Sequence, residues 1–182
     1  MDSGFSALEL LVAMTILVVI TTVALAVFAS AQKGFGVLWS DTLANMAARR
    51  CLGAICRDLR ASAPDHIALD ASDPNCDAVR IQVPVGYANG VVEWGADGKP
   101  GQFVLYTVSN GALHRYIVDA TNAGVGLPAV LATGVDVTRN GRKGFAFRRD
   151  GNLCTLELRM RVDRNGPVRY RLALTGVVAR NL

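Results

Sequence analysis

Charged side chains are missing from a long stretch near the start of the chain. Between Glu9 and Lys33 there is no acidic or basic residue, and the polar side chains of residues 10–29 are threonines alone. About twenty apolar residues in a helix are enough to cross a bilayer. Residues 10–29 therefore predict a membrane-spanning helix. The run is too long for a cleaved secretory signal peptide, and acids rather than basic residues precede it.

The sequence also lacks the residue patterns of a catalytic site. Its two histidines, His66 and His114, have no metal-ligand spacing, and no Gly-x-Ser-x-Gly motif occurs. The glycine-rich residues 124–126 lack the lysine and hydroxyl of a phosphate-binding loop. The acids of residues 65–77 do not follow the spacing of a calcium-binding loop and suit turns instead. We therefore expect no enzyme activity, no cofactor and no bound metal.

Basic residues outnumber acids, which raises the question of an anionic partner. The net charge is +4, and the basic residues concentrate in residues 139–149 and 159–171. In residues 157–163, however, charges of both signs alternate with apolar side chains, as in a half-buried strand with a solvated face. No aromatic series for base stacking accompanies it. These observations disfavour nucleic acid binding. The alternative function is an anchored extracytoplasmic module that contacts DNA or another anionic partner through a basic sheet.

The residues just before the uncharged stretch form a distinctive motif. Gly4-Phe5-Ser6-Ala7-Leu8-Glu9 combine a glycine, an aromatic residue and an acid, in fixed order, with the long apolar run that follows. This motif resembles the processing site of type IV prepilins and type II secretion pseudopilins. The resemblance implies a leader of residues 1–4, cleavage between Gly4 and Phe5 by a prepilin peptidase, and N-methylation of Phe5.

Glu9 is the only ionisable residue in the apolar run that ends at Ala31. A carboxylate at the edge of an apolar layer is costly unless it finds a partner. In the prepilin interpretation, cleavage leaves an ammonium group on Phe5 at a similar depth, and Glu9 pairs with that ammonium in a neighbouring subunit. The simpler alternative is that Glu9 marks the interfacial end of a membrane anchor and reaches water.

The resemblance implies a pilin-like α+β fold, and the residue patterns agree with it. Residues 5–31 predict the transmembrane and assembly helix, and apolar positions at helical spacing in residues 32–63 predict its amphipathic continuation. Gly34 and Gly36 either permit a bend or are tolerated at a small cost. Pro64 predicts the end of the helix.

Residues 64–182 predict an antiparallel β-rich domain, since short alternating segments are separated by turn residues. Asn110-Gly111, Asp150-Gly151 and Asn165-Gly166 are expected to form hairpin turns. The expected strands are residues 78–85, 91–94, 102–109, 112–119, 130–138, 144–149, 153–163 and 168–178.

The chain has four cysteines, Cys51, Cys56, Cys76 and Cys154. The resemblance places their domain outside the cytoplasm, where disulfides are the usual state of an even number of cysteines. On one helix Cys51 and Cys56 lie about 7.5 Å apart along the axis and on diverging faces, too far for a bridge. Each is then expected to pair with Cys76 or Cys154. We favour Cys56 with Cys76 and Cys51 with Cys154.

Size and strand count resemble the larger minor subunits, the J-type minor pseudopilin and the W-type minor pilin. Such a subunit helps to initiate or cap a filament. The resemblance implies that its partners are other pilins or pseudopilins in a hetero-oligomeric filament tip, the prepilin peptidase and membrane lipid. It also implies a single-pass inner-membrane protein whose C-terminal domain lies in the periplasm or outside, and which enters a filament after cleavage.

Overall fold

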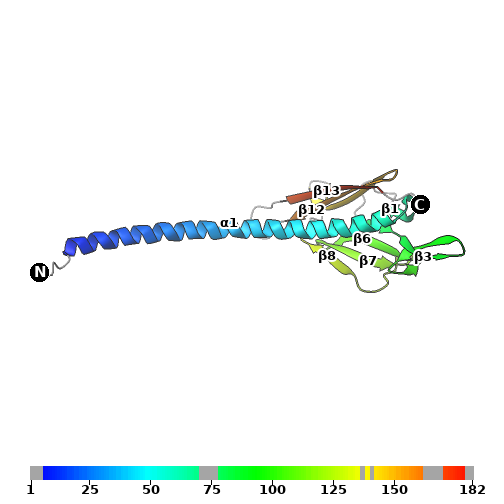
Figure 1. The fold of residues 1–182 in the computed structure, drawn as a ribbon, viewed down its shortest axis with the longest axis horizontal. Coiled ribbons are helices and arrows are strands. Elements are labelled where there is room, and N and C mark those ends of the chain that lie inside the picture. Colours follow the sequence, from blue (N-terminus) through cyan, green and yellow to red (C-terminus); the bar gives the residue numbers. More distant parts are fainter. Residues whose placement is uncertain (1–5, 70–77, 136–137, 140–141, 162–169, 179–182) are drawn as a thin grey trace. The chain divides into compact units, whose positions relative to one another are not determined.

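The computed structural model describes residues 6–69, 78–135, 138–139, 142–161 and 170–178 of the 182-residue chain. It divides into two compact units, Met1–Asp41 and Thr42–Leu182, which we describe separately. The described part of the first unit consists of helix alone, and the second contains the remainder of that helix with all the strands (Figure 1).

The helix α1 runs from Ala7 to Ala61. It is unbroken at Gly34 and Gly36, and a side chain added at either glycine would meet no described atom within 4 Å. Both glycines are thus tolerated within a continuous helix. The helix ends as expected before Pro64, which begins the short 3-10 helix η1 (Pro64–His66).

The second unit is built around a five-stranded antiparallel sheet, with strand order β1-β2-β6-β7-β8. Within this sheet β6 and β7 form a hairpin, and their turn residues Asn110 and Gly111 have φ angles of 51° and 70°. That conformation is typical of the two-residue hairpin turn that this dipeptide predicts. The strands are β1 (Ile67–Leu69), β2 (Ala78–Ile81), β6 (Phe103–Ser109), β7 (Ala112–Val118) and β8 (Ala129–Thr133).

Three smaller antiparallel sheets complete the unit. The first contains β11 (Phe145–Asp150), β12 (Leu153–Arg161) and β13 (Tyr170–Val178). The second contains β3 (Val83–Ala88), β4 (Val91–Ala96) and β5 (Lys99–Pro100), and the third contains β9 (Thr138–Arg139) and β10 (Arg142–Lys143). An isolated bridge between Val135 and Met160 links the chain after β8 to β12.

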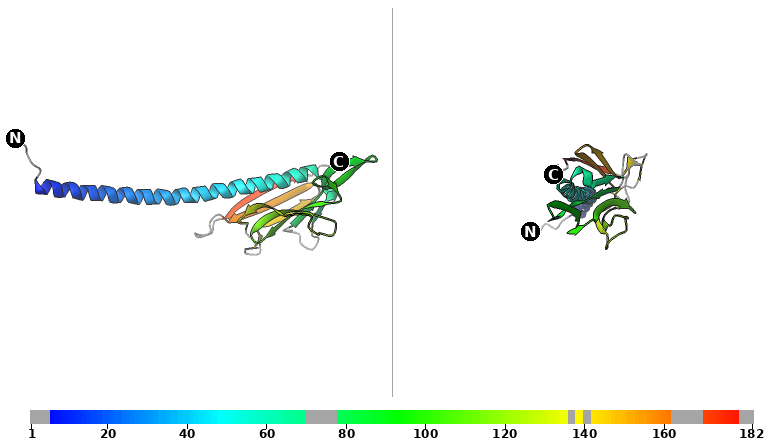
Figure 2. Two further views of the ribbon diagram at one scale, coloured as in Figure 1. Left: turned by 90° about the horizontal axis from the view of Figure 1, so that it is seen from below. Right: turned by 90° about the vertical axis from the view of Figure 1, so that its right-hand side faces the viewer.

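The C-terminal part of α1 lies between the five-stranded sheet and the β11–β13 sheet (Figure 2). Its inward face contributes Cys51, Ile55 and Leu59, each with none of its surface exposed. Tyr106 from β6 and Phe147 from β11 are equally buried within the same cluster. The core is therefore a three-layer arrangement in which one helix supplies apolar side chains to two sheets.

Arg149 fastens the end of the helix to the β11–β12 hairpin. Its guanidinium donates to the carbonyl oxygens of Pro64 at 2.6 Å, Ile67 at 3.3 Å and Gly151 at 3.0 Å. These carbonyls belong to η1, to the first residue of β1 and to the hairpin turn. A single side chain thus satisfies backbone acceptors from three elements where the chain leaves the helix.

The predicted α+β class is confirmed at the level of one long N-terminal helix and antiparallel sheets. The single strand expected for residues 78–85 is wrong: β2 ends at Ile81 in the five-stranded sheet, and β3 begins at Val83 in a different sheet. Gln82 lies between them and is buried. The strand expected for residues 130–138 ends instead at Thr133. A hairpin joins β11 and β12 as expected, but its turn residues are Gly151 and Asn152 rather than Asp150 and Gly151, because Asp150 still pairs with Leu153. Asn165-Gly166 lies outside the described residues.

Candidate functional site

The N-terminus of α1 is capped by two reciprocal hydrogen bonds between Ser6 and Glu9. The backbone N–H of Ser6 donates to Oε2 of Glu9 at 2.9 Å, and the backbone N–H of Glu9 donates to Oγ of Ser6 at 3.2 Å. This is a capping box, which satisfies two backbone donors that a helix N-terminus leaves without partners. The Ser-x-x-Glu spacing was readable in the sequence, but the interpretation of Glu9 as an assembly residue overlooked it. Glu9 therefore has a local role as well.

The capping box occupies only one oxygen of the Glu9 carboxylate. Oε2 alone receives a hydrogen bond from a described residue, and the side chain is exposed. Gly4 and Phe5, the predicted cleavage pair, lie outside the described residues. The structure thus places the acid but not the amine with which it was predicted to pair.

Between Glu9 and Ala31 the surface of α1 is apolar on all sides, apart from hydroxyl groups. In residues 7–36 every side chain is exposed, and by length and composition α1 can cross a membrane, a test that a signal sequence also passes. Its hydroxyls bond back to the helix itself, for example from Thr15 to the carbonyl of Val12 at 2.8 Å and from Thr22 to that of Val18 at 2.7 Å. Polar atoms satisfied within the helix need no water, which suits a lipid or an apolar bundle.

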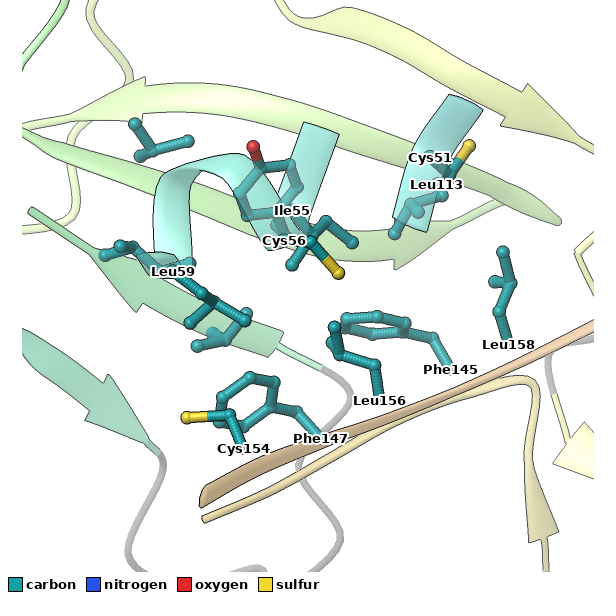
Figure 3. Packing of buried hydrophobic residues seen from close by; sticks show 14 of the residues in the cluster. Cys51, Ile55, Cys56, Leu59, Leu113, Phe145, Phe147, Cys154, Leu156 and Leu158 are labelled. Atoms are coloured by element: carbon teal, nitrogen blue, oxygen red, sulfur yellow. The ribbon is translucent and has the colours of Figure 1, made fainter. Parts of the chain in front are cut away.

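The predicted Cys51–Cys154 disulfide is not formed. Both residues are buried thiols, and their side chains stand at opposite ends of the cluster in Figure 3. The register explains the separation: Cys154 pairs with Arg149, which contacts Pro64 just after the helix. Cys51 lies ten residues before the helix end, about 15 Å away along the axis. The helix places the two sulfurs at different levels of the core.

Cys56 belongs to the same apolar core. Cys56 is buried beside Ile55 in the sequence, whereas Cys76 lies outside the described residues, so their pairing stays a prediction. Burial raises the pKa of the Cys51 thiol to about 11 and also raises the pKa of Cys154. These two thiols are therefore protonated at neutral pH and behave as small apolar side chains.

One polar network joins the helix to the five-stranded sheet at the edge of the core. The hydroxyl of Tyr106 donates to Oδ2 of Asp58 at 2.6 Å, and the guanidinium of Arg115 lies 3.8 Å from that same oxygen. Arg115 also bonds Oδ1 of Asp97 at 3.0 Å. Burial, followed by the Asp58 carboxylate, raises the pKa of Tyr106 far above that of a free tyrosine. The network fixes the helix on the sheet, and sequence patterns did not reveal it.

The histidines do not come together. His66 stacks on Trp94 with ring centroids 4.0 Å apart, and its Nδ1–H donates to Oε1 of Gln82 at 3.0 Å. His114 lies on β7, with its ring 5.7 Å from that of Tyr116. Among the described residues no group of three His, Cys, Asp or Glu side chains is placed to hold a metal ion.

Comparisons of the chain with models of protein families, with curated proteins and with solved structures give no match. The residues of the chain itself therefore carry the functional argument. They define a helix with a capped acidic start, an apolar surface suited to lipid or to other helices, and a well-packed β domain.

Proposed function

We propose that this chain is a minor pilin or minor pseudopilin, a structural subunit that helps to initiate or cap a type IV pilus or a type II secretion pseudopilus. The observation that carries the proposal is Glu9, the lone acid at the start of an exposed and otherwise apolar helix. Cleavage after Gly4 would leave the ammonium group of Phe5 four residues before it in the sequence. Such an end is suited to pairing with the same end of a neighbouring helix.

Assembly in this proposal is a transfer of α1 from lipid to a bundle of helices. Lipid tails and neighbouring apolar helices are similar surroundings for aliphatic side chains, so the transfer has a small net cost. A buried charge without a partner costs several kcal/mol, and pairing Glu9 with the ammonium of Phe5 removes that cost for both groups. The charge pair then selects the axial position at which one helix enters beside another.

The capping box is compatible with this second role. A carboxylate accepts through two oxygens. Oε2 of Glu9 can stay bonded to the N–H of Ser6 at 2.9 Å while Oε1 accepts from the ammonium of a neighbour. The helix need not lose its cap when it assembles, and the cap holds the carboxylate at the helix end before assembly.

The capping box also provides a sharp test, because glutamine can replace glutamate in it while removing the charge. We expect Glu9→Gln and Glu9→Ala each to insert in the membrane but to be missing from sheared filaments of cells that express the tagged full chain. Ser6→Ala, which weakens the cap and keeps the charge, should still assemble. If Glu9→Gln assembles normally while Glu9→Ala does not, capping rather than charge pairing is the role of Glu9.

Mass spectrometry of the mature N-terminus tests processing directly. The proposal expects N-methylated Phe5 as the first residue. An intact Met1 or a cut near Ala29 would refute it. The alternative, an anchored module that binds DNA or another anionic partner, is tested by the salt dependence of binding. Phosphate contacts weaken steeply as the ionic strength rises, whereas apolar packing between subunits does not.

A further inference from the structure

The outward face of α1 in the second unit carries an isolated row of arginines. Arg49, Arg50, Arg57 and Arg60 are all exposed, whereas Cys51, Ile55 and Leu59 on the opposite side are buried. At 100° per residue the four arginines fall within about 100° of the helix circumference and extend over about 16 Å of its length. None of the four makes an ion pair with a described residue. We call this face the arginine ridge.

No acid of the same helix neutralises the arginine ridge. Asp58 lies within it in sequence but accepts the hydroxyl of the buried Tyr106 at 2.6 Å. Asp41 lies two turns before Arg49, outside the ridge. Arg57 and Arg60 lie one turn apart and repel each other, and Arg49 and Arg50 add two more positive charges about two turns before Arg57. The charge of the ridge calls for a partner of the opposite sign.

Gly53 lies in the middle of the arginine ridge. It is exposed within the helix, and a side chain added there would meet no atom of the described residues within 4 Å. Glycine is less favourable than alanine in a helix interior, and packing within the described part of this chain does not require it. A small residue at this position permits another helix to approach the backbone of α1 closely. The arginines on either side of Gly53 can then reach carboxylates of that second helix.

Apolar side chains continue the arginine ridge toward the N-terminus. Met46 lies one turn before Arg49 and Arg50, and Leu43 lies one turn before Met46; their exposed fractions are 45% and 50%. A polyanion such as nucleic acid satisfies arginines but not an adjoining apolar patch. An amphipathic helix with acids on one part of its face and apolar residues on the next fits both.

We propose that the arginine ridge, with Gly53 at its centre and Leu43 and Met46 at its end, is the docking face for an acidic amphipathic helix of a different protein. Charge complementarity identifies the occupant. A second copy using the same face is disfavoured, because a two-fold contact sets arginines against arginines. The proposal stands on this face alone and does not depend on processing at Gly4 or on the role of Glu9.

The test uses the full chain in an uncharged detergent and two synthetic helical peptides of equal length. Both carry the same leucine stripe, and one carries glutamates where the other carries glutamines. By fluorescence anisotropy at low salt, the glutamate peptide should bind about tenfold more tightly than the glutamine peptide. Arg57→Glu should remove this preference. Lys99→Glu, an equal change of charge at an exposed site on β5, should keep it.

Gly53→Leu separates helix docking from simple attraction of anions. It leaves every charge in place, so it should weaken the glutamate peptide while duplex DNA and anionic lipid vesicles, tested as probes, are unaffected. Melting temperatures verify that each variant is folded. Equal binding of both peptides, an equal loss in Lys99→Glu, or full peptide binding by Gly53→Leu would overturn the proposal. So would a change in the association state of the chain by itself in Arg57→Glu, which would identify a second copy as occupant.

Discussion

Ile16 and Ile55 belong to one continuous helix, yet the first is 54% exposed and the second is fully buried. Around Ile55 the apolar side chains occupy one face and arginines the other, which is the pattern of a helix that packs on a protein core. Around Ile16 the apolar side chains surround the helix and are all exposed. The two regions have the same secondary structure and different environments. The region around Ile55 packs on apolar side chains of this chain, whereas the region around Ile16 is exposed and suited by length and composition to a membrane.

Truncation of these two isoleucines should give the largest difference in the free energy of unfolding between the two regions. Ile55→Ala leaves a cavity between the two sheets and should lower the free energy of unfolding of the β domain by about 2–5 kcal/mol. Ile16→Ala, the matched change in the first unit, should leave it within about 0.5 kcal/mol. Chemical unfolding in uncharged detergent, followed by tryptophan fluorescence, measures both. Equal losses would mean that the two regions unfold as one.

A smaller effect is expected from the polar network of the second unit. Tyr106→Phe removes the donor to Asp58 and should cost about 1–3 kcal/mol, whereas Tyr87→Phe at a site 72% exposed should cost little. The pKa of Tyr106 is raised on folding, so its stabilisation is complete below about pH 10, near the pKa of free tyrosine, and is lost as the pH rises further. The slope of stability against pH above about 10 should be shallower in Tyr106→Phe. An unchanged slope would contradict the buried, protonated hydroxyl.

Arg149→Leu should have an effect of about 1 kcal/mol, because the carbonyls of Pro64 and Ile67 lose a charged donor at a partly exposed site. Arg149→Lys should recover only part of it, since an ammonium cannot reproduce the planar fork of the guanidinium. Thermal unfolding of the two variants gives the difference. Full recovery by lysine would show that charge alone, rather than shape, holds the end of the helix.

Cys51→Ala should lower the free energy of unfolding by about 1 kcal/mol, because it removes a buried thiol. The loss would be about 2–5 kcal/mol if the substitution removed a disulfide. The test is paired with reductant, which should not change the melting temperature of a Cys56→Ser, Cys76→Ser double variant. In that variant iodoacetamide should label both remaining cysteines once the unreduced protein is unfolded. If Cys51 and Cys154 were protected from labelling, the result would support the predicted Cys51–Cys154 disulfide.

The sequence was most informative where a feature is local. The span of the helix, its end before Pro64 and the Asn110-Gly111 turn depend on neighbouring residues, and the structure confirms them. The hydrogen bond between Tyr106 and Asp58 joins residues 48 apart in sequence, and only the packing of the helix on the sheet brings them together. The Cys51–Cys154 prediction failed for the same reason, because spacing excludes a nearby partner but does not give the level of a strand beside a helix.

The smallest expected effect lies in the first turn of α1. Ser6→Ala removes one bond of the capping box, worth about 0.5–1 kcal/mol to the first turn, and hydrogen exchange of the amides of residues 7–9 should accelerate accordingly. Since the side chains of this first turn are exposed, the β domain should unfold at an unchanged denaturant concentration, in contrast to Ile55→Ala. Ser6→Thr should restore slow exchange, because threonine also caps helices. Slow exchange in Ser6→Ala would mean that surroundings other than its own cap hold the first turn of α1.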